Sequence, residues 1–346
     1  MSRRGLTLLL AGLLALGLTL AAAVGSVPYV GLGPGPTYNT LGEVDGEPVL
    51  TVEGRRSFPT DGHLDLTTVS VQTPLTLVQA LQGWFDRDVA VVPRDLVFDP
   101  QQSDEEIDEE NTVAMRDSQN VAVRAAARHL GLKVADVSVA ELAPESPARG
   151  RLEVGDVLAS VDGEAVRDGS ELRQRITSRS PGEPVRIGYT RNGAAGTAVI
   201  TTTEASGQDG EPVAVIGVVT EEEPVDVPFE VEISLDEVGG PSAGLMFTLG
   251  ILDKLDEQSL TGGKYIAGTG EISTDGTVGQ IGGIDHKLVA ARRKGADAFL
   301  VPADNCAEAV AGAPDGLLLV QVGTLTEALA ALAGVRDGDD VTTCPA

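Results

Sequence analysis

Histidine and cysteine, the residues that most often hold zinc, are scarce in this chain of 346 residues, which has three histidines and two cysteines. The histidines, His63, His129 and His286, are scattered, and no His-Glu-x-x-His motif occurs. Cys306 and Cys344 also lack the spacing of a metal site. The sequence therefore predicts no bound metal, and no motif in it indicates a cofactor.

Basic patches and nucleotide-binding motifs are lacking too. Lys and Arg number 25 against 52 Asp and Glu, which gives a formal net charge of −27. Nucleic-acid binding is not expected, because it depends on clustered positive charge. The phosphate-binding pattern Gly-x-x-x-x-Gly-Lys-Ser/Thr does not occur. We therefore expect no ATP binding and no nucleic-acid partner.

What stands out is a serine on a glycine-rich turn. Residues 239–244 read Gly-Gly-Pro-Ser-Ala-Gly, and apolar residues at helical spacing follow. We predict a helix over residues 241–255 with Pro241 in its first position. Ser242 would then lie beside unpaired N–H groups and the positive end of the helix dipole. The backbone of Gly240, Pro241 and Ser242 is the candidate oxyanion site. An ordinary capped helix after a glycine turn is the alternative.

The second candidate residue is Lys287, 45 positions after Ser242. Serine needs a base to act as a nucleophile, and lysine serves only if burial lowers its pKa well below about 10.4. Apolar neighbours, Asp285 as a helix cap and Gly295 as the helix end favour a buried Lys287; an exposed lysine is the alternative. His286 is a rival base. Adjacent helix residues point about 100° apart, so only one of the two can face Ser242.

From about residue 216 to 332 the chain resembles the proteolytic domain of the Lon proteases. Besides the serine turn, the resemblance rests on Gly-Thr-Gly-Glu-Ile at 268–272, on Val-Gly-Gln-Ile-Gly-Gly at 278–283 and on Lys287. It implies that Ser242 is the nucleophile, that Lys287 is the base and that Thr269 helps to hold the lysine amine.

Two residues near these motifs are less clear. Glu271 either joins the same network or has a structural role. Many Lon domains carry an acidic residue three positions before the serine, where this chain has Gly239. That departure puts in doubt any geometry or regulation that depends on the missing carboxylate, but not the Ser–Lys pair.

From about residue 134 to 203 the chain resembles a PDZ domain. The residues that carry the resemblance are Ser-Pro-Ala at 146–148, the stretch 152–158 and Val-Asp-Gly at 161–163, where Asp-Gly predicts a hairpin turn. A helix at Ser170–Ile176 and a second hairpin around Arg191-Asn192-Gly193 complete the pattern. PDZ domains bind peptides by strand addition, and we predict Val137–Leu142 as the groove strand. Another small β-rich domain is the alternative.

Residues 6–24 are uncharged and mostly apolar, and Arg3 and Arg4 precede them. Their length nearly spans a bilayer, and the arginines predict a cytoplasmic N-terminus with everything after about residue 30 outside. The alternative is a cleaved signal peptide, although its apolar core usually runs only about 7–15 residues. Both export the rest of the chain, where Cys306 and Cys344 either pair and pin the C-terminal tail or remain free.

The fold class that we predict is multidomain α+β in five parts. These are a cytoplasmic tip and transmembrane anchor at 1–30, a linker and structural extension at 31–133, a β-rich PDZ domain at 134–205, an α+β Lon-type protease domain at 210–335 and a C-terminal tail at 336–346. Within the extension we expect short β runs, a helix at 75–85, an acidic loop or helix start at 104–110, and a helix at 117–130 that ends at Gly131.

This order resembles the membrane-anchored PDZ–Lon proteases of bacteria, the YlbL-type family, across nearly the full chain. The resemblance implies a single-pass, ATP-independent serine endopeptidase of the cell membrane, with an extracytoplasmic catalytic domain and protein or peptide substrates selected or gated by the PDZ domain. Lon-type domains often form rings, so a homo-oligomer such as a hexamer stays open. The alternatives are a membrane-bound PDZ adaptor with a scaffold-like protease domain and a Ser–Lys amidohydrolase of cell-wall precursors.

Overall fold

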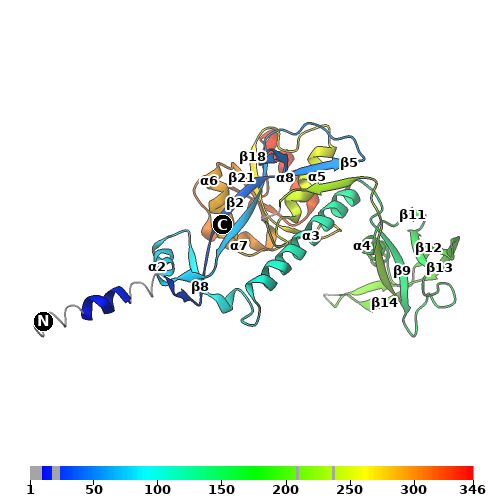
Figure 1. The fold of residues 1–346 in the computed structure, drawn as a ribbon. Helices are drawn as coiled ribbons and strands as arrows, with labels where there is room; N and C mark the ends of the chain where they lie inside the picture. The colour runs from blue at the N-terminus through cyan, green and yellow to red at the C-terminus, as the bar shows by residue number, and fades with distance from the viewer. Residues whose placement is uncertain (1–9, 18–23, 208–209, 236–237, 346) are drawn as a thin grey trace, which may run out of the picture.

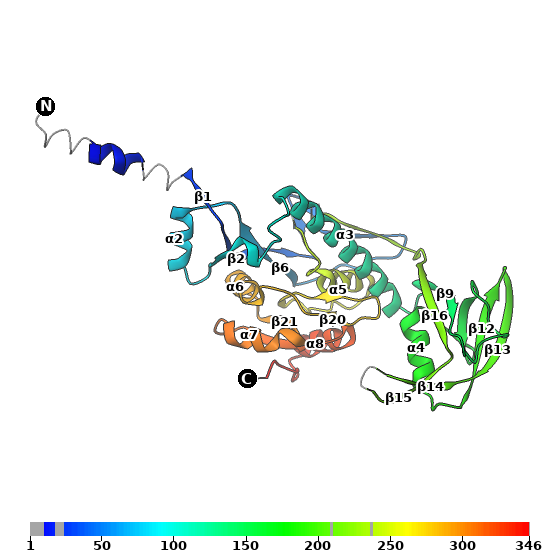
Figure 2. The same ribbon diagram turned by 90° about the horizontal axis from the view of Figure 1, so that it is seen from below.

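The computed structural model describes residues 10–17, 24–207, 210–235 and 238–345. Figures 1 and 2 show a larger domain with the N-terminal segment at one end and a smaller, β-rich domain at the other. Helix α3 (Asp104–His129) runs across the larger domain toward the smaller one. The chain therefore enters the smaller domain from the larger domain and returns to it afterwards.

A six-stranded mixed sheet, in the order β22-β21-β18-β6-β2-β8, forms the centre of the larger domain. Strands β22, β21, β18 and β6 run parallel, whereas β2 is antiparallel to both β6 and β8. The strands are β2 (Tyr29–Asn39), β6 (His63–Gln72), β8 (Ala90–Pro93), β18 (Tyr265–Gly268), β21 (Ala298–Pro302) and β22 (Leu318–Val322).

Helices cover both faces of this sheet. Successive residues of a strand point to opposite faces, so each strand contributes side chains to two hydrophobic cores. In β21, Ala298 and Leu300 enter one hydrophobic core, and Phe299 and Val301 enter the other. The first core is shared with α3, α5 and α8, and the second with α6 and α7. These helices are α5 (Gly244–Leu255), α6 (Ile284–Lys294), α7 (Cys306–Gly312) and α8 (Leu325–Asp337).

The prediction that residues 31–133 form a linker and structural extension is wrong. Strand β6 pairs in parallel with β18, so that His63 lies opposite Tyr265, and β5 (Leu50–Glu53) pairs with β17 (Glu230–Ile233). Helix α3 starts at the acidic residues and runs past the predicted start at 117. The segment therefore supplies the middle of the sheet and a core helix of the larger domain.

The smaller domain has a five-strand path β13-β12-β10-β9-β16, with the short β11 paired to β10. Both predicted hairpins are confirmed, because Asp162-Gly163 and Asn192-Gly193 adopt the positive φ angles of tight turns. Its elements are β9 (Ala135–Leu142), β10 (Val157–Val161), β11 (Glu164–Ala165), α4 (Gly169–Thr177), β12 (Pro184–Arg191), β13 (Ala194–Thr201) and β16 (Val218–Pro224).

The predicted groove strand, Val137–Leu142, is wrong. It belongs to β9, which pairs with β10 on one side and along its whole length with β16 on the other. Strand β16 ends the sheet, and its Glu222 side chain lies against Gly169 at the start of α4. Among the described strands, β16 is therefore the one whose free edge lies beside α4, where a peptide strand can be added.

The predicted anchor at residues 6–24 lies partly outside the described residues; of its described part, residues 10–17 form a helix and Val24 lies just before β1. None of the helices in the described ranges combines the length and the apolar composition that a bilayer span requires. The next elements are β1 (Ser26–Val27), β7 (Leu75–Thr76), α2 (Leu77–Phe85) and the 3-10 helix η1 (Arg94–Leu96). The remaining short elements are β3 (Glu43–Val44), β4 (Glu47–Pro48), β14 (Thr203–Ser206), β15 (Pro212–Val215), β19 (Glu271–Ile272), β20 (Val278–Gly279) and η2 (Ala303–Asn305).

Cys306 and Cys344, which the sequence left open as paired or free, form a disulfide bond. The backbone N–H of Cys344 also donates to Leu319 O at 3.1 Å, and Thr343 bridges to Val320. The C-terminal tail is thus attached to the edge strand β22 and to the start of α7.

Candidate active site

Ser242 lies in the turn that leads into α5. The helix begins at Gly244, three residues later than predicted, so Pro241 is not its first residue. Gly240 has a φ of 85°, a backbone conformation that residues with a side chain rarely adopt. The turn therefore places Ser242 just before the helix, with the N-cap Ala243 between them.

Helix α3 holds this turn from the side. The N–H of Gly240 donates to Asn111 O at 2.9 Å, and the Ser118 hydroxyl donates to Pro241 O at 3.0 Å. Asn111 and Ser118 are seven residues apart, so they lie on the same face of the helix. Neither residue was predicted from the sequence. Asn111 acts through its backbone O, which any residue could offer, and only Ser118, a polar residue on the buried face of α3, gives a usable signal.

These contacts correct the predicted oxyanion site. The Gly240 N–H is already used by Asn111, and Pro241 has no N–H to offer. In the described part of the chain, the backbone N–H groups of Ser242 and Ala243 have no acceptor. These two are therefore the donors available to a developing oxyanion beside the serine hydroxyl.

Lys287 lies in the first part of α6. The helix is capped by Gly283 in a left-handed conformation, and the predicted cap Asp285 instead accepts from the N–H of His286 at 2.8 Å. The predicted end at Gly295 is confirmed. Lys287 is only 2% exposed, so its long side chain is enclosed by the protein.

The lysine amine, the serine and a threonine form a compact triangle. Lys287 Nζ lies 2.7 Å from Ser242 Oγ and 2.9 Å from Thr269 Oγ1. The Thr269 hydroxyl in turn donates to the backbone O of Ser242 at 2.9 Å. Burial lowers the pKa of Lys287 from 10.5 to about 7. A substantial fraction of the amine is therefore neutral near neutral pH.

The other residues considered from the sequence lie outside this triangle. His286 is buried, and its Nε2 is 4.0 Å from Asp285 Oδ1. Glu271 lies on the cleft wall with its side chain exposed. A side chain at Gly239 would meet Asn111 Cβ at 2.8 Å. Helix α3 thus fills the space that an acidic residue at this position would need.

The triangle opens into a cleft of about 450 Å³. One wall is the stretch of β6 from Leu66 to Val71, and the other includes Ser242, Glu271 and Lys287. Among the described residues, no group of three or more His, Cys, Asp or Glu side chains is arranged to hold a metal ion.

Part of β6 has an unpaired edge in this cleft. Thr40 N donates to Leu64 O, and Pro34, which has no N–H, lies opposite Val69. Along a strand, the backbone N–H and C=O groups of successive residues point alternately to the two neighbouring strands. The two contacts therefore show that the even-numbered residues of β6 direct these groups to β2 and that the odd-numbered residues direct theirs to the other side. Within the described ranges, that other side is paired with β18 only as far as Leu66. The backbone groups of Val69 and Val71 are thus free to pair with another strand.

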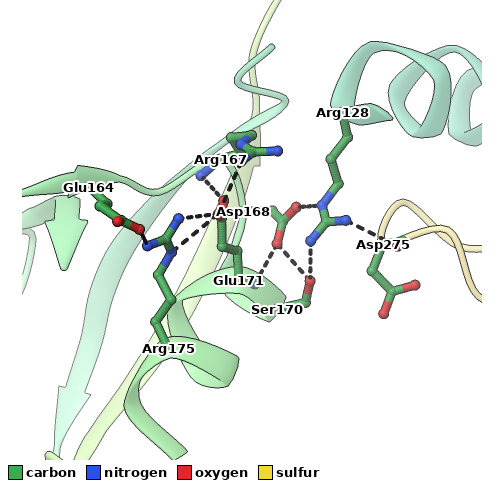
Figure 3. A network of polar contacts seen from close by, with 8 residues as sticks. All are labelled: Arg128, Glu164, Arg167, Asp168, Ser170, Glu171, Arg175 and Asp275. Carbon is green, nitrogen blue, oxygen red and sulfur yellow. Dashed lines mark hydrogen bonds and ion pairs between the residues drawn. The ribbon is translucent and has the colours of Figure 1, made fainter. Parts of the chain in front are cut away.

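Figure 3 shows the contacts where the two domains meet. Arg128, in the last turn of α3, forms an ion pair with Asp168, the N-cap of α4, and donates to Ser170 Oγ at 3.4 Å and to Asp275 O at 3.1 Å. Burial raises the pKa of Asp168, but hydrogen bonds from Ser170, from the Glu171 N–H and from Arg128 outweigh it, so the pKa stays below its ordinary value. One arginine therefore joins α3, α4 and the β19–β20 turn.

Comparison with known proteins assigns both domains. A PDZ domain family model matches residues 110–202, and the model of the Lon protease (S16) C-terminal proteolytic domain matches residues 235–329. Lon protease 2 of Bacillus subtilis is 35% identical over 92 residues, which is 27% of this chain and 16% of the relative. Lon protease 1 of Sorangium cellulosum is 40% identical over 94 residues, 26% of this chain and 11% of the relative.

The matches are partial. The chain spans less than a fifth of the length of these two relatives. Among solved structures, the PDZ domain of an SdrC-like protein from Listeria monocytogenes is 29% identical and covers 25% of this chain and 86% of its own, with a TM-score of 0.22, which is too low to support an assignment by itself. On the two family models, the chain carries a PDZ domain and a serine-peptidase domain of the Lon (S16) type.

Proposed function

We propose that this chain is an ATP-independent serine endopeptidase in which Lys287 is the general base for Ser242. The observation that carries the proposal is the 2.7 Å contact between Lys287 Nζ and Ser242 Oγ, made by an enclosed amine whose pKa is about 7. A neutral amine at this distance can accept the serine proton. Thr269 is a positioning residue, since it holds the amine from a second direction.

The reaction is acyl transfer. Neutral Lys287 accepts the hydroxyl proton as Ser242 Oγ attacks the peptide carbonyl carbon, and the N–H groups of Ser242 and Ala243 stabilise the oxyanion. The C–N bond breaks as the lysine ammonium gives its proton to the leaving amine, which produces an acyl-enzyme and a new N-terminus. Lys287 then takes a proton from water, the resulting attack releases the acid product, and the proton returns to Ser242.

The substrate chain lies as an extended strand along the free edge of β6. Val69 and Val71 offer it backbone donors and acceptors, which pair with any sequence, while side chains of the cleft set preference. An edge of this kind accepts only extended chains. The enzyme therefore acts on unfolded or flexible segments, in keeping with the lack of an ATPase motif in the sequence.

The PDZ domain selects substrates or gates the protease domain by binding a peptide on β16 beside α4. Asp168, the N-cap of α4, is paired with Arg128 of α3, and α3 holds the serine turn. A peptide that displaces α4 would therefore act on the serine turn through Arg128 and α3.

The enzyme works at the cell membrane, anchored by residues 6–24, with its catalytic domain outside the cytoplasm. The apolar stretch and the two preceding arginines support this location. So does the disulfide bond between Cys306 and Cys344, since disulfides persist mainly in oxidising compartments.

The test is cleavage of an unfolded protein such as reduced, carboxymethylated casein by the full chain, without ATP, with fragments mapped by mass spectrometry. Ser242→Ala and Lys287→Met should each abolish cleavage while keeping the fold, and Lys294→Met, at the other end of α6, is the matched control that should keep activity. Cleavage that survives both active-site substitutions would refute the proposal. A folded wild-type protein that binds peptides without cutting them would favour the adaptor.

A further inference from the structure

Helix α2 carries its large apolar residues on the outside. Its exposed face consists of Leu77, Val78, Leu81, Trp84 and Phe85, with Trp84 55% and Phe85 89% exposed. These positions follow the i, i+1, i+4, i+7, i+8 spacing of one helix face. The small residues Ala80 and Gly83 face the domain, and a Cβ at Gly83 would lie 2.5 Å from Val91 Cγ2. The helix thus packs on the domain through its small residues, and its large apolar side chains are exposed.

The apolar surface continues beyond the helix. Tyr29 packs edge-on against Trp84 with the ring centroids 5.9 Å apart, and Tyr29 lies opposite Pro93 in the sheet. Leu96, in the adjoining η1, is 76% exposed. We call the five residues of the helix face, together with Tyr29 and Leu96, the α2 surface. Contiguous exposed apolar residues of this kind mark an interaction site.

The α2 surface lies where the N-terminal segment joins the domain. Strand β1 pairs with β7, and Thr76 of β7 is the N-cap of α2. Only two residues separate Val24, the last of the uncharged apolar stretch, from Val27 in this pair. Figure 2 shows β1 beside α2, at the end of the larger domain opposite the PDZ domain. An anchor in residues 6–24 would therefore bring the α2 surface to the membrane.

We infer that the α2 surface rests on a phospholipid bilayer, with α2 lying in the plane of the interface. The inference rests on the proposed membrane anchor. Tryptophan and tyrosine concentrate at the membrane interface, and interfacial helices bury their apolar face about 5–10 Å into the headgroup boundary. Asp86 and Arg87, directly after the helix, carry opposite charges, and the chain as a whole is acidic. Apolar insertion, not attraction to anionic lipid, therefore drives the contact.

This orientation places the cleft close to the bilayer. Val69 and Val71 line the cleft, and the chain continues through Gln72 to Leu75 at the start of the α2 region. At about 3.3 Å per residue, Val69 and Leu75 are at most roughly 20 Å apart. A bilayer-bound enzyme would therefore have its cleft close to the segments of membrane-tethered proteins that lie next to the membrane.

The experiment uses Trp84, the only tryptophan in the chain. The full chain is reconstituted in phosphatidylcholine vesicles, with or without lipids brominated on the acyl chains, and Trp84 emission is recorded with acrylamide as the aqueous quencher. We expect a blue shift, loss of emission with brominated lipid and protection from acrylamide. Replacing Leu81 and Phe85 together by Asp should reverse all three, whereas Val154→Asp, at an exposed apolar position in the PDZ domain, should change none.

Two results would overturn the inference. Emission that acrylamide quenches and brominated lipid does not would mean that the surface faces water. Protection from both quenchers would mean that a second copy or another segment of this chain covers it. Ser242→Ala should give the same quenching as the wild type, because the contact needs no catalysis. Failure of this inference is thus distinguishable from failure of the proposed peptidase.

Discussion

The ionisation of Lys287 should control the rate of cleavage. Only the neutral amine can accept the Ser242 proton, and burial lowers the lysine pKa to about 7. We therefore expect kcat/KM to rise about tenfold per pH unit below pH 7 and to level off above it. An exposed lysine would place the same transition near pH 10.4. The position of the transition therefore tests burial of the amine directly.

The same group should affect stability. Each pKa unit is about 1.4 kcal/mol, so the shift from 10.5 to about 7 corresponds to at most about 5 kcal/mol. The folded-state value is the lower one, so between pH 7 and 10 the unfolded chain binds the extra proton and stability from this group rises with pH. Below pH 7 the cost of the buried charge is fully present. Lys287→Met should therefore be inactive but more stable than the wild type at pH 6, with the gain shrinking toward pH 10.

The assay is a pH series of initial rates on a quenched-fluorescence peptide, with urea unfolding of both proteins at pH 6 and pH 9. The difference between wild type and Lys287→Met isolates this one group from all others that titrate. A rate that is flat from pH 5.5 to 9, or a variant that gains no stability at pH 6, would refute the reasoning.

Three further predictions follow from single contacts. Thr269→Val should lower kcat by about tenfold to a hundredfold with little change in KM, and Thr269→Ser should restore it, because the hydroxyl positions the amine. Replacing Cys306 and Cys344 by Ser should lower the free energy of unfolding by about 2–4 kcal/mol in urea titrations and leave the initial rate unchanged. Arg128→Gln should abolish any effect of a PDZ-binding peptide on the cleavage rate, whereas Arg175→Gln, which loses contacts only within the PDZ domain, should keep it.

The candidate site was predictable mainly because short motifs resemble those of the Lon proteolytic domain. The Gly-Gly-Pro-Ser turn and the apolar neighbours of Lys287 indicate a nucleophile and a buried base, whereas the resemblance chose Lys287 over His286 and implied the role of Thr269. The structure brings Ser242, Lys287 and Thr269 together as the resemblance implied. The oxyanion donors were predicted less well, because the Gly240 N–H is used by the backbone O of Asn111, a residue 129 positions earlier in the chain.

The order and pairing of the strands in the sheet were not predictable from local patterns. Short alternating runs predict strands, but they do not say that His63 lies opposite Tyr265 or that Leu50 lies opposite Ile233. The prediction of Val137–Leu142 as the groove strand was wrong for the same reason. Strand β9 has the pattern of a half-exposed strand, and only the return of β16 along it removes its free edge.

The position of the PDZ domain in the chain has a mechanical consequence. It is inserted into the protease domain, and its two connections start from α3, which holds the serine turn through Asn111 and Ser118, and from β16, the strand open to a peptide ligand. Strand β16 leads within a few residues to β17, after which the chain reaches Ser242. Val225 N also donates to Val134 O, which ties the two connections together at 3.2 Å. A ligand that shifts β16 is therefore connected to the serine turn by two routes, one through α3 and one through the chain that runs from β17 to Ser242, whereas a domain appended at a terminus would have one connection at most.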